Sequence, residues 1–198
     1  NRATQYPRRN YVDNIEYHIC KSIIINHYAE SEESAEIYFQ SLVDRGNSVQ
    51  IDGAKFGLAQ ASLSSDPAKS EAMLLKLLEK YPNQISLELT LSEALFNQER
   101  KKEAIHSLET LLDRNPNNYP TSIVLSEAYM EQGRYESSEK LLKNLTRYRP
   151  ENTMVWYMLA EVHGKTGNIA DLHEARAEFF ILTNRFESAT EQLKLAEQ

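Results

Sequence analysis

The residues best suited to chemistry in this sequence are its five histidines, but they complete no catalytic or metal-binding motif. His173-Glu174 begins like the zinc-protease motif H-E-x-x-H, in which two histidines four residues apart on one helix hold the metal. Residue 177 is Ala, so the second histidine is missing. His163 could approach His173 across a turn, but two histidines without a third placed ligand are more typical of surface or packing positions. The sequence therefore predicts no catalytic residue, metal ligand or cofactor in this chain.

The remaining composition excludes several classes of function. There is no Gly-rich phosphate loop and no nucleophile elbow. The net charge of −7 argues against nucleic-acid binding, which needs a basic face to displace counterions from phosphates. Cys20 is the only cysteine, which excludes an internal disulfide, and its neighbours Ile19, Ile23 and Ile24 indicate a buried position. Apolar runs such as 179–182 are far shorter than the roughly 20 residues that cross a bilayer, so no membrane insertion is expected.

A period of 34 residues is the strongest organising signal in the chain. The columns that keep it hold a proline, a leucine, a small residue, a glutamate and a glycine: Pro82/Pro116/Pro150, Leu91/Leu125/Leu159, Ser92/Ser126/Ala160, Glu93/Glu127/Glu161 and Gly133/Gly167. This is the period of the tetratricopeptide repeat (TPR), a pair of antiparallel helices joined by a turn. Each proline is expected to follow a helix and stop it, because proline lacks the N–H that would continue the helix.

Residues 85–167 resemble the TPR family in residue type as well as in period. Trp156 stands at the large aromatic position, Leu159-Ala160 is the leucine–small pair that lets helices approach, and Gly167 marks the inter-helix turn. Three positions depart from the family's tyrosine, tyrosine and glycine: Leu95, His163 and Glu99. The resemblance implies an all-α, TPR-type helical-repeat solenoid, a right-handed superhelix of antiparallel helix pairs.

The predicted organisation is a leader over 1–10 followed by a single TPR-like domain over 11–198. Its expected parts are two non-consensus helices over 11–46, repeats over 48–84, 85–118, 119–152 and 153–184, and a terminal helix pair over 170–198. The terminal pair overlaps the last repeat because Arg185-Phe186-Glu187-Ser188 echoes Arg134-Tyr135-Glu136-Ser137 at a spacing of 51 residues. The helix at about 170–183 is therefore expected to close one pair and open the next.

The first helix of each repeat lines the concave face of such an array, and the family resemblance assigns a peptide-binding groove to it. The implied groove residues are Leu89, Glu93, Phe96 and Asn97, then Ile123, Glu127, Met130 and Glu131, then Met154, Tyr157, Glu161 and Lys165. They give an apolar column beside an acidic column, which suits an extended or helical peptide that is not acidic. The alternative is that the apolar side chains pack against neighbouring repeats and the glutamates are merely solvated.

The C-terminal third carries a more particular resemblance. Residues 155–169, followed by His173-Glu174-Ala175-Arg176-Ala177-Glu178-Phe179-Phe180, are similar to the end of the TPR domain of bacterial periplasmic zinc metalloproteases of the BepA (YfgC) type. Tyr6-Pro7-Arg8-Arg9 and Ile15-Glu16-Tyr17-His18 resemble the linker and first helices of that domain. The resemblance implies a periplasmic location and a separate H-E-x-x-H protease domain that would hold zinc. It also implies three kinds of partner, namely outer-membrane protein clients, the barrel-assembly machinery and that protease domain.

The sequence leaves three classes of function to compare. The first is a binding module of a periplasmic protease–chaperone, and the start at Asn1 favours it because it indicates a fragment or processed product. The second is a free-standing TPR adaptor in the cytoplasm. The third is an enzyme in its own right, which the lack of a complete ligand or nucleophile set disfavours.

Overall fold

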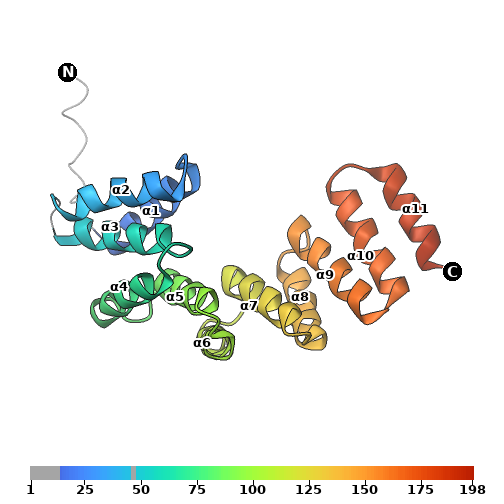
Figure 1. Cartoon of the computed structure of the whole chain (residues 1–198). Coiled ribbons are helices and arrows are strands. Elements are labelled where there is room, and N and C mark those ends of the chain that lie inside the picture. The colour runs from blue at the N-terminus through green and yellow to red at the C-terminus, as the bar shows by residue number, and fades with distance from the viewer. Residues whose placement is uncertain (1–13, 46–47) are drawn as a thin grey trace, which may run out of the picture. The chain divides into compact units, whose positions relative to one another are not determined.

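The computed structural model describes residues 14–45 and 48–198, which form α-helices and, over those ranges, no β-strand (Figure 1). The helices are α1 (Ile15–Tyr28), α2 (Glu32–Val43), α3 (Ser48–Ala61), α4 (Pro67–Lys80), α5 (Ile85–Asn97), α6 (Lys101–Arg114), α7 (Tyr119–Glu131), α8 (Tyr135–Tyr148), α9 (Thr153–Thr166), α10 (Ile169–Leu182) and α11 (Phe186–Ala196). The all-α prediction is confirmed. The predicted leader over 1–10 lies outside the described residues. Within them, every helix is too short or too polar to span a membrane.

The helices fall into two compact units, residues 1–100 and 101–198. The boundary lies between α5 and α6, inside the repeat predicted over 85–118. Each unit has buried apolar clusters of its own: Ile19, Phe56 and Leu74 are central in the first, and Leu142, Val155 and Leu159 in the second.

The helix ends follow the signals that the sequence carries. Asp66, with proline at the next position, accepts a hydrogen bond from the backbone N–H of Lys69 at 3.0 Å and so caps α4. Asn118 caps α7 in the same way, by accepting a hydrogen bond from the backbone N–H of Thr121. Asn152 caps α9 by accepting one from the backbone N–H of Val155. Because α4, α6 and α8 end at residues 80, 114 and 148, each repeat proline follows its helix by two residues.

The turns inside the helix pairs share a left-handed residue at the repeat spacing. The φ angles of Glu99, Gly133 and Gly167 are 59°, 69° and 76°. Glycine adopts this conformation without steric cost, which explains Gly133 and Gly167. Glu99 takes the same conformation in the glycine column, so the departure from the family pattern changes the residue and leaves the turn geometry intact.

In the first unit, α3 packs against both α1 and α2. The side-chain hydroxyl of Ser22 donates to the carbonyl oxygen of Gly53 at 2.9 Å, and the Asn26 amide donates to that of Gly57 at 3.0 Å. The buried stripe of α1 therefore turns polar after Ile19.

The prediction that Cys20 is buried is wrong, because Cys20 is exposed. Its neighbours Ile23 and Ile24, on which that prediction rested, have exposed side chains as well. The close contact between α1 and the α3 backbone places Ser22 in the interior and leaves Asn26 half-buried at its edge, while Cys20, Ile23 and Ile24 face outward.

In the second unit, α10 packs against both α9 and α11, and the three helices lie side by side at the orange-to-red end of the chain (Figure 1). In this arrangement α10 packs in two helix pairs, one with α9 and one with α11. The small residues of the 34-residue repeat are buried as expected, with Ser126 at α7 and Ala160 at α9. A small side chain there leaves room for the neighbouring helix to approach closely.

Candidate functional site

Three carboxylates gather on α7 and α9 in the second unit. Burial raises the pKa of Glu127, and the negative charges of Glu131 and Glu161 raise it further. Glu131 lies 3.7 Å from the ammonium group of Lys101. Over residues 14–45 and 48–198, no ion pair joins Glu127 or Glu161 to a basic side chain. The face therefore carries negative charge that the protein itself leaves largely uncompensated.

An apolar pocket of about 390 Å³ lies next to these carboxylates. It is lined by Tyr157, Ala160, Glu161, Arg176, Phe179, Phe180 and Gln192, from α9, α10 and α11. The rings of Tyr157 and Phe179 are 6.1 Å apart between centroids, and those of Phe179 and Phe180 are 5.6 Å apart. Tyr157 is 55% exposed although it is aromatic. Because Glu161 belongs to the pocket and interacts with Glu127, the acidic and apolar features form one continuous face, called here the α7/α9/α10 face.

The predicted groove residues of α7 and α9 divide into packed and open positions. Ile123 and Met130 are half-buried and pack against the core cluster of the second unit, as the packing alternative expected. Met154, Tyr157 and Lys165 are exposed. The apolar column of the second unit therefore packs against the core at α7, and it is open to solvent only at α9.

The four predicted groove residues of α5 belong to the first unit. Leu89, Glu93 and Phe96 are half-buried, and Asn97 is exposed. The side-chain amide of Asn97 donates a hydrogen bond to the carbonyl oxygen of Leu63 at 2.8 Å, so this side chain is bound within the first unit. The α7/α9/α10 face is thus built from second-unit residues.

Sequence reasoning missed the contribution of α10 and α11 to this pocket. In the sequence, Phe179 and Phe180 belong to a short apolar run and to the segment that resembles the BepA-type domain, and neither feature pointed to a pocket. The available signal was the pair of adjacent aromatic residues on a helix whose buried positions are held by the small residues Ala175 and Ala177. Adjacent residues on a helix point in directions about 100° apart, so both cannot enter the same core stripe.

A larger hollow of about 860 Å³ lies between α6 and α8. Its charged lining is mixed, with Glu109, Asp113, Glu136 and Glu139 facing Lys140, Lys143 and Arg147. The hydroxyl of Tyr129 donates a hydrogen bond to Glu109 at 2.7 Å. Burial is the main reason why the pKa of Tyr129 is raised to about 12, and this hydrogen bond is the second. Near-balanced charge gives this hollow little preference for a charged ligand, so it is a weaker candidate.

The two histidines expected to approach each other have different partners. His163 is buried in α9 beside Asp171, and burial lowers its pKa. The Nδ1 atom of His173 lies 2.8 Å from the side-chain oxygen of Gln192.

The charge on Glu127 is expected to cost stability. Its raised pKa means that the folded chain holds the carboxyl proton more tightly than the unfolded chain. The cost is therefore present at pH 7 and disappears as the pH falls through the folded-state pKa towards the ordinary value of 4.5. We expect Glu127→Gln to raise the thermal unfolding midpoint at pH 7 and to bring no gain at about pH 4. The control is Glu136→Gln, at a position that is exposed to solvent like that of Glu127; an equal gain from it would contradict the specific role of Glu127.

Comparison with known proteins agrees with this architecture. Residues 98–162 match the family model of the tetratricopeptide repeat. None of the curated protein sequences matches the chain. Among solved structures, TTC0263 of Thermus thermophilus, described as a thermophilic TPR protein, has a TM-score of 0.68 at 15% identity, covering 93% of this chain and 99% of that one.

Two further structures extend the likeness. YrrB, described as a TPR protein with an unusual peptide-binding site, has a TM-score of 0.59 at 14% identity, covering 92% of this chain and 93% of that one. MamA (41-end) from Desulfovibrio magneticus RS-1 has a TM-score of 0.59 at 14% identity, covering 74% of this chain and 93% of that one. At these identities the likeness shows the fold. The chain is a helical-repeat solenoid, and its match to the tetratricopeptide-repeat model covers residues 98–162.

Proposed function

We propose that this chain is a protein–protein interaction module whose α7/α9/α10 face binds a polypeptide segment with both basic and apolar side chains. The observation that carries the proposal is the pair of uncompensated carboxylates, Glu127 and Glu161, beside the exposed ring of Tyr157. A lysine or arginine of the partner would relieve the repulsion among the carboxylates. An apolar side chain of the same segment would fill the pocket at Phe179 and Phe180.

Charge complementarity selects this occupant over an acidic one. An acidic segment would add to the repulsion that already raises the pKa of Glu127. A purely apolar segment would cover the carboxylates without pairing them, and burying unpaired charge is costly. The presence of Arg176 at the pocket edge allows a single acidic or polar group at one end of the segment. The similar fold of YrrB, which is described as having an unusual peptide-binding site, supports the use of such a repeat array for peptide capture.

The test is the binding of a fluorescently labelled peptide in which lysines alternate with leucines, measured by fluorescence anisotropy with the full chain. We expect Glu127→Lys/Glu161→Lys to weaken binding by about tenfold or more, and added salt to weaken binding to the unchanged protein. Tyr157→Ala is expected to weaken binding through the lost apolar contact, with helical content unchanged by circular dichroism.

The matched control is Glu136→Lys/Glu187→Lys, which changes the net charge equally at exposed positions outside the pocket lining. Equal weakening by the control would mean that only the overall charge attracts the peptide. Normal binding by the folded Glu127→Lys/Glu161→Lys variant would show that the face is assigned wrongly.

We further propose that the chain is the TPR domain of a periplasmic metalloprotease–chaperone of the BepA type. The support is the resemblance of residues 155–180 to that family. In this proposal, the catalytic zinc belongs to a protease domain outside this chain. The segment held by the α7/α9/α10 face belongs to an outer-membrane protein client or to the barrel-assembly machinery.

The mass of the native protein, isolated from its source, tests this second proposal. A mass well above 22.8 kDa, with an H-E-x-x-H peptide in its digest, would support the fused protease. A mass near 22.8 kDa would overturn it and favour a free-standing adaptor, for which a cytoplasmic location is the alternative.

A further inference from the structure

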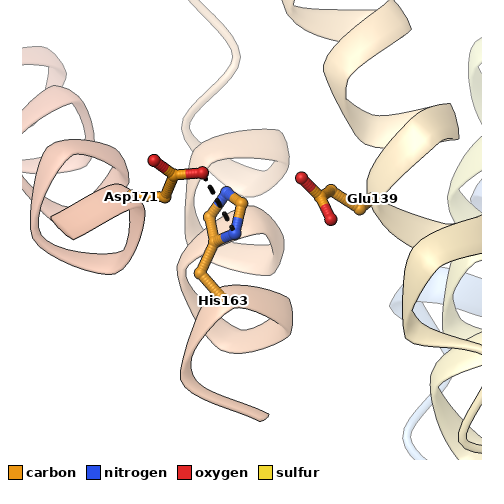
Figure 2. A group of neighbouring side chains, drawn as sticks. All are labelled: Glu139, His163 and Asp171. Atoms are coloured by element: carbon orange, nitrogen blue, oxygen red, sulfur yellow. Dashed lines mark ion pairs between the residues drawn. The ribbon is translucent and has the colours of Figure 1, made fainter. Parts of the chain in front are cut away.

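The side chains of Glu139, His163 and Asp171 converge from α8, α9 and α10 (Figure 2). One potential ligand atom of each lies within 4.8 Å of the others. His163 is 3% exposed, and its Nδ1 atom is buried without a hydrogen-bond partner. Asp171 Oδ2 lies 3.9 Å from that nitrogen, which is too long for a hydrogen bond. A buried, unpaired ring nitrogen that faces two carboxylates calls for a group between them.

We propose that Glu139, His163 and Asp171 form a binding site for a divalent transition-metal ion of the zinc class. The donor set decides the class of ion, because zinc accepts imidazole nitrogen together with carboxylate oxygen. Calcium and magnesium prefer all-oxygen surroundings. Three protein ligands leave a fourth position for water, as is common when zinc is not fully enclosed.

The geometry requires a modest closure of the cluster. Ligand atoms about 2.1 Å from a tetrahedral zinc ion lie about 3.4 Å from one another. Starting from a spread of 4.8 Å, the carboxylates must move inward by about 1.4 Å at most. The side chain of Asp171 is 45% exposed and that of Glu139 is 20% exposed, so both have room to rotate. His163, held in the core, is the fixed point of the site.

Lys143 is the cation that lies beside the two carboxylates in this structure. Its ammonium group is 2.6 Å from Glu139 Oε1 and 3.7 Å from Asp171 Oδ2. The lysine side chain is 52% exposed and can turn into solvent. A divalent ion carries twice the charge of the Lys143 ammonium group and binds all three donors at once. The ion and the ammonium group therefore compete for the same carboxylates. Removing Lys143 should therefore tighten metal binding, which a purely structural cluster would not show.

The experiment is a calorimetric titration of the full chain, freed of metal by a chelator, with zinc chloride, alongside thermal unfolding. We expect one zinc ion per chain and a higher unfolding midpoint, because the ion binds only the folded arrangement. Asp171→Asn and Glu139→Gln are expected to weaken binding by about tenfold or more, since each removes a charged ligand. Lys143→Met is expected to tighten it. His173→Asn removes a histidine outside the cluster and should leave the affinity unchanged.

Three outcomes would overturn the proposal. One is the absence of zinc binding at millimolar zinc chloride, and another is binding that Asp171→Asn and Glu139→Gln leave unchanged. The third is weakening by His173→Asn equal to that of the ligand variants, which would place the ion elsewhere. Should Asp171→Asn lose helical content, the opposite shifts expected for Glu139→Gln and Lys143→Met decide the question.

Discussion

Replacing Leu142 with alanine is expected to lower the free energy of unfolding of the second unit by about 3 kcal/mol. Leu142 is fully buried in α8 and belongs to the cluster that holds Leu145, Val155 and Leu159. Truncation removes buried methyl groups and leaves a cavity that helices on several sides prevent from closing. Urea unfolding followed by circular dichroism measures the loss.

The matched control for Leu142 is Leu193→Ala in α11, where the same side chain is 46% exposed. We expect that change to cost about 0.5 kcal/mol or less, since little apolar surface leaves water at this position. Equal losses at the two positions would contradict the assignment of the core. A loss at Leu142 without any change in the first unit would show that the two units unfold separately.

Replacing Gly57 with alanine is expected to destabilise the first unit by about 1–3 kcal/mol. A Cβ atom at Gly57 would lie less than 3.0 Å from three ring atoms of Phe39, closer than real Cβ contacts allow. Phe39 is 1% exposed, so its ring cannot swing away. This overpacking exceeds the gain of about 0.5–1 kcal/mol that alanine usually gives over glycine inside a helix.

Gly164→Ala provides the control, because a Cβ atom there meets only Leu172, at an ordinary 3.8 Å. We expect this change in α9 to raise stability by about 0.5–1 kcal/mol. A second variant, Phe39→Leu, should relieve the clash, so that the double variant is more stable than the two separate losses predict. Additive losses, or stabilisation by Gly57→Ala alone, would show that α2 and α3 are not in close contact at this point.

The face proposed for polypeptide binding and the proposed metal site lie on neighbouring elements. Both use α9 and α10, which the metal cluster joins to α8. Zinc binding would therefore stiffen the helices that carry Tyr157 and Phe179. Because the peptide test and the zinc test use different variants, each proposal can fail without the other.

The sequence by itself determined the period of the repeats, the helix ends and the turns. These features depend on contacts within a few residues: Asp66 caps its own helix, Pro116 stops the helix before it, and Gly133 adopts a left-handed turn. The repeat spacing also predicted that Glu127 and Glu161 lie in one column, and the negative charge of Glu161 contributes to the raised pKa of Glu127. Local chemistry and a regular period are sufficient for such features.

Only the tertiary structure decided which side of an irregular helix is buried and which distant side chains meet. Helix α1 has isoleucines on more than one side, and the carbonyl groups of Gly53 and Gly57 on α3 bind Ser22, which is buried, and Asn26, which is half-buried. The cluster of Glu139, His163 and Asp171 likewise depends on how α8, α9 and α10 pack. The sequence spacing of these three residues matches no metal motif, because the ligands come from three helices whose arrangement is set by packing.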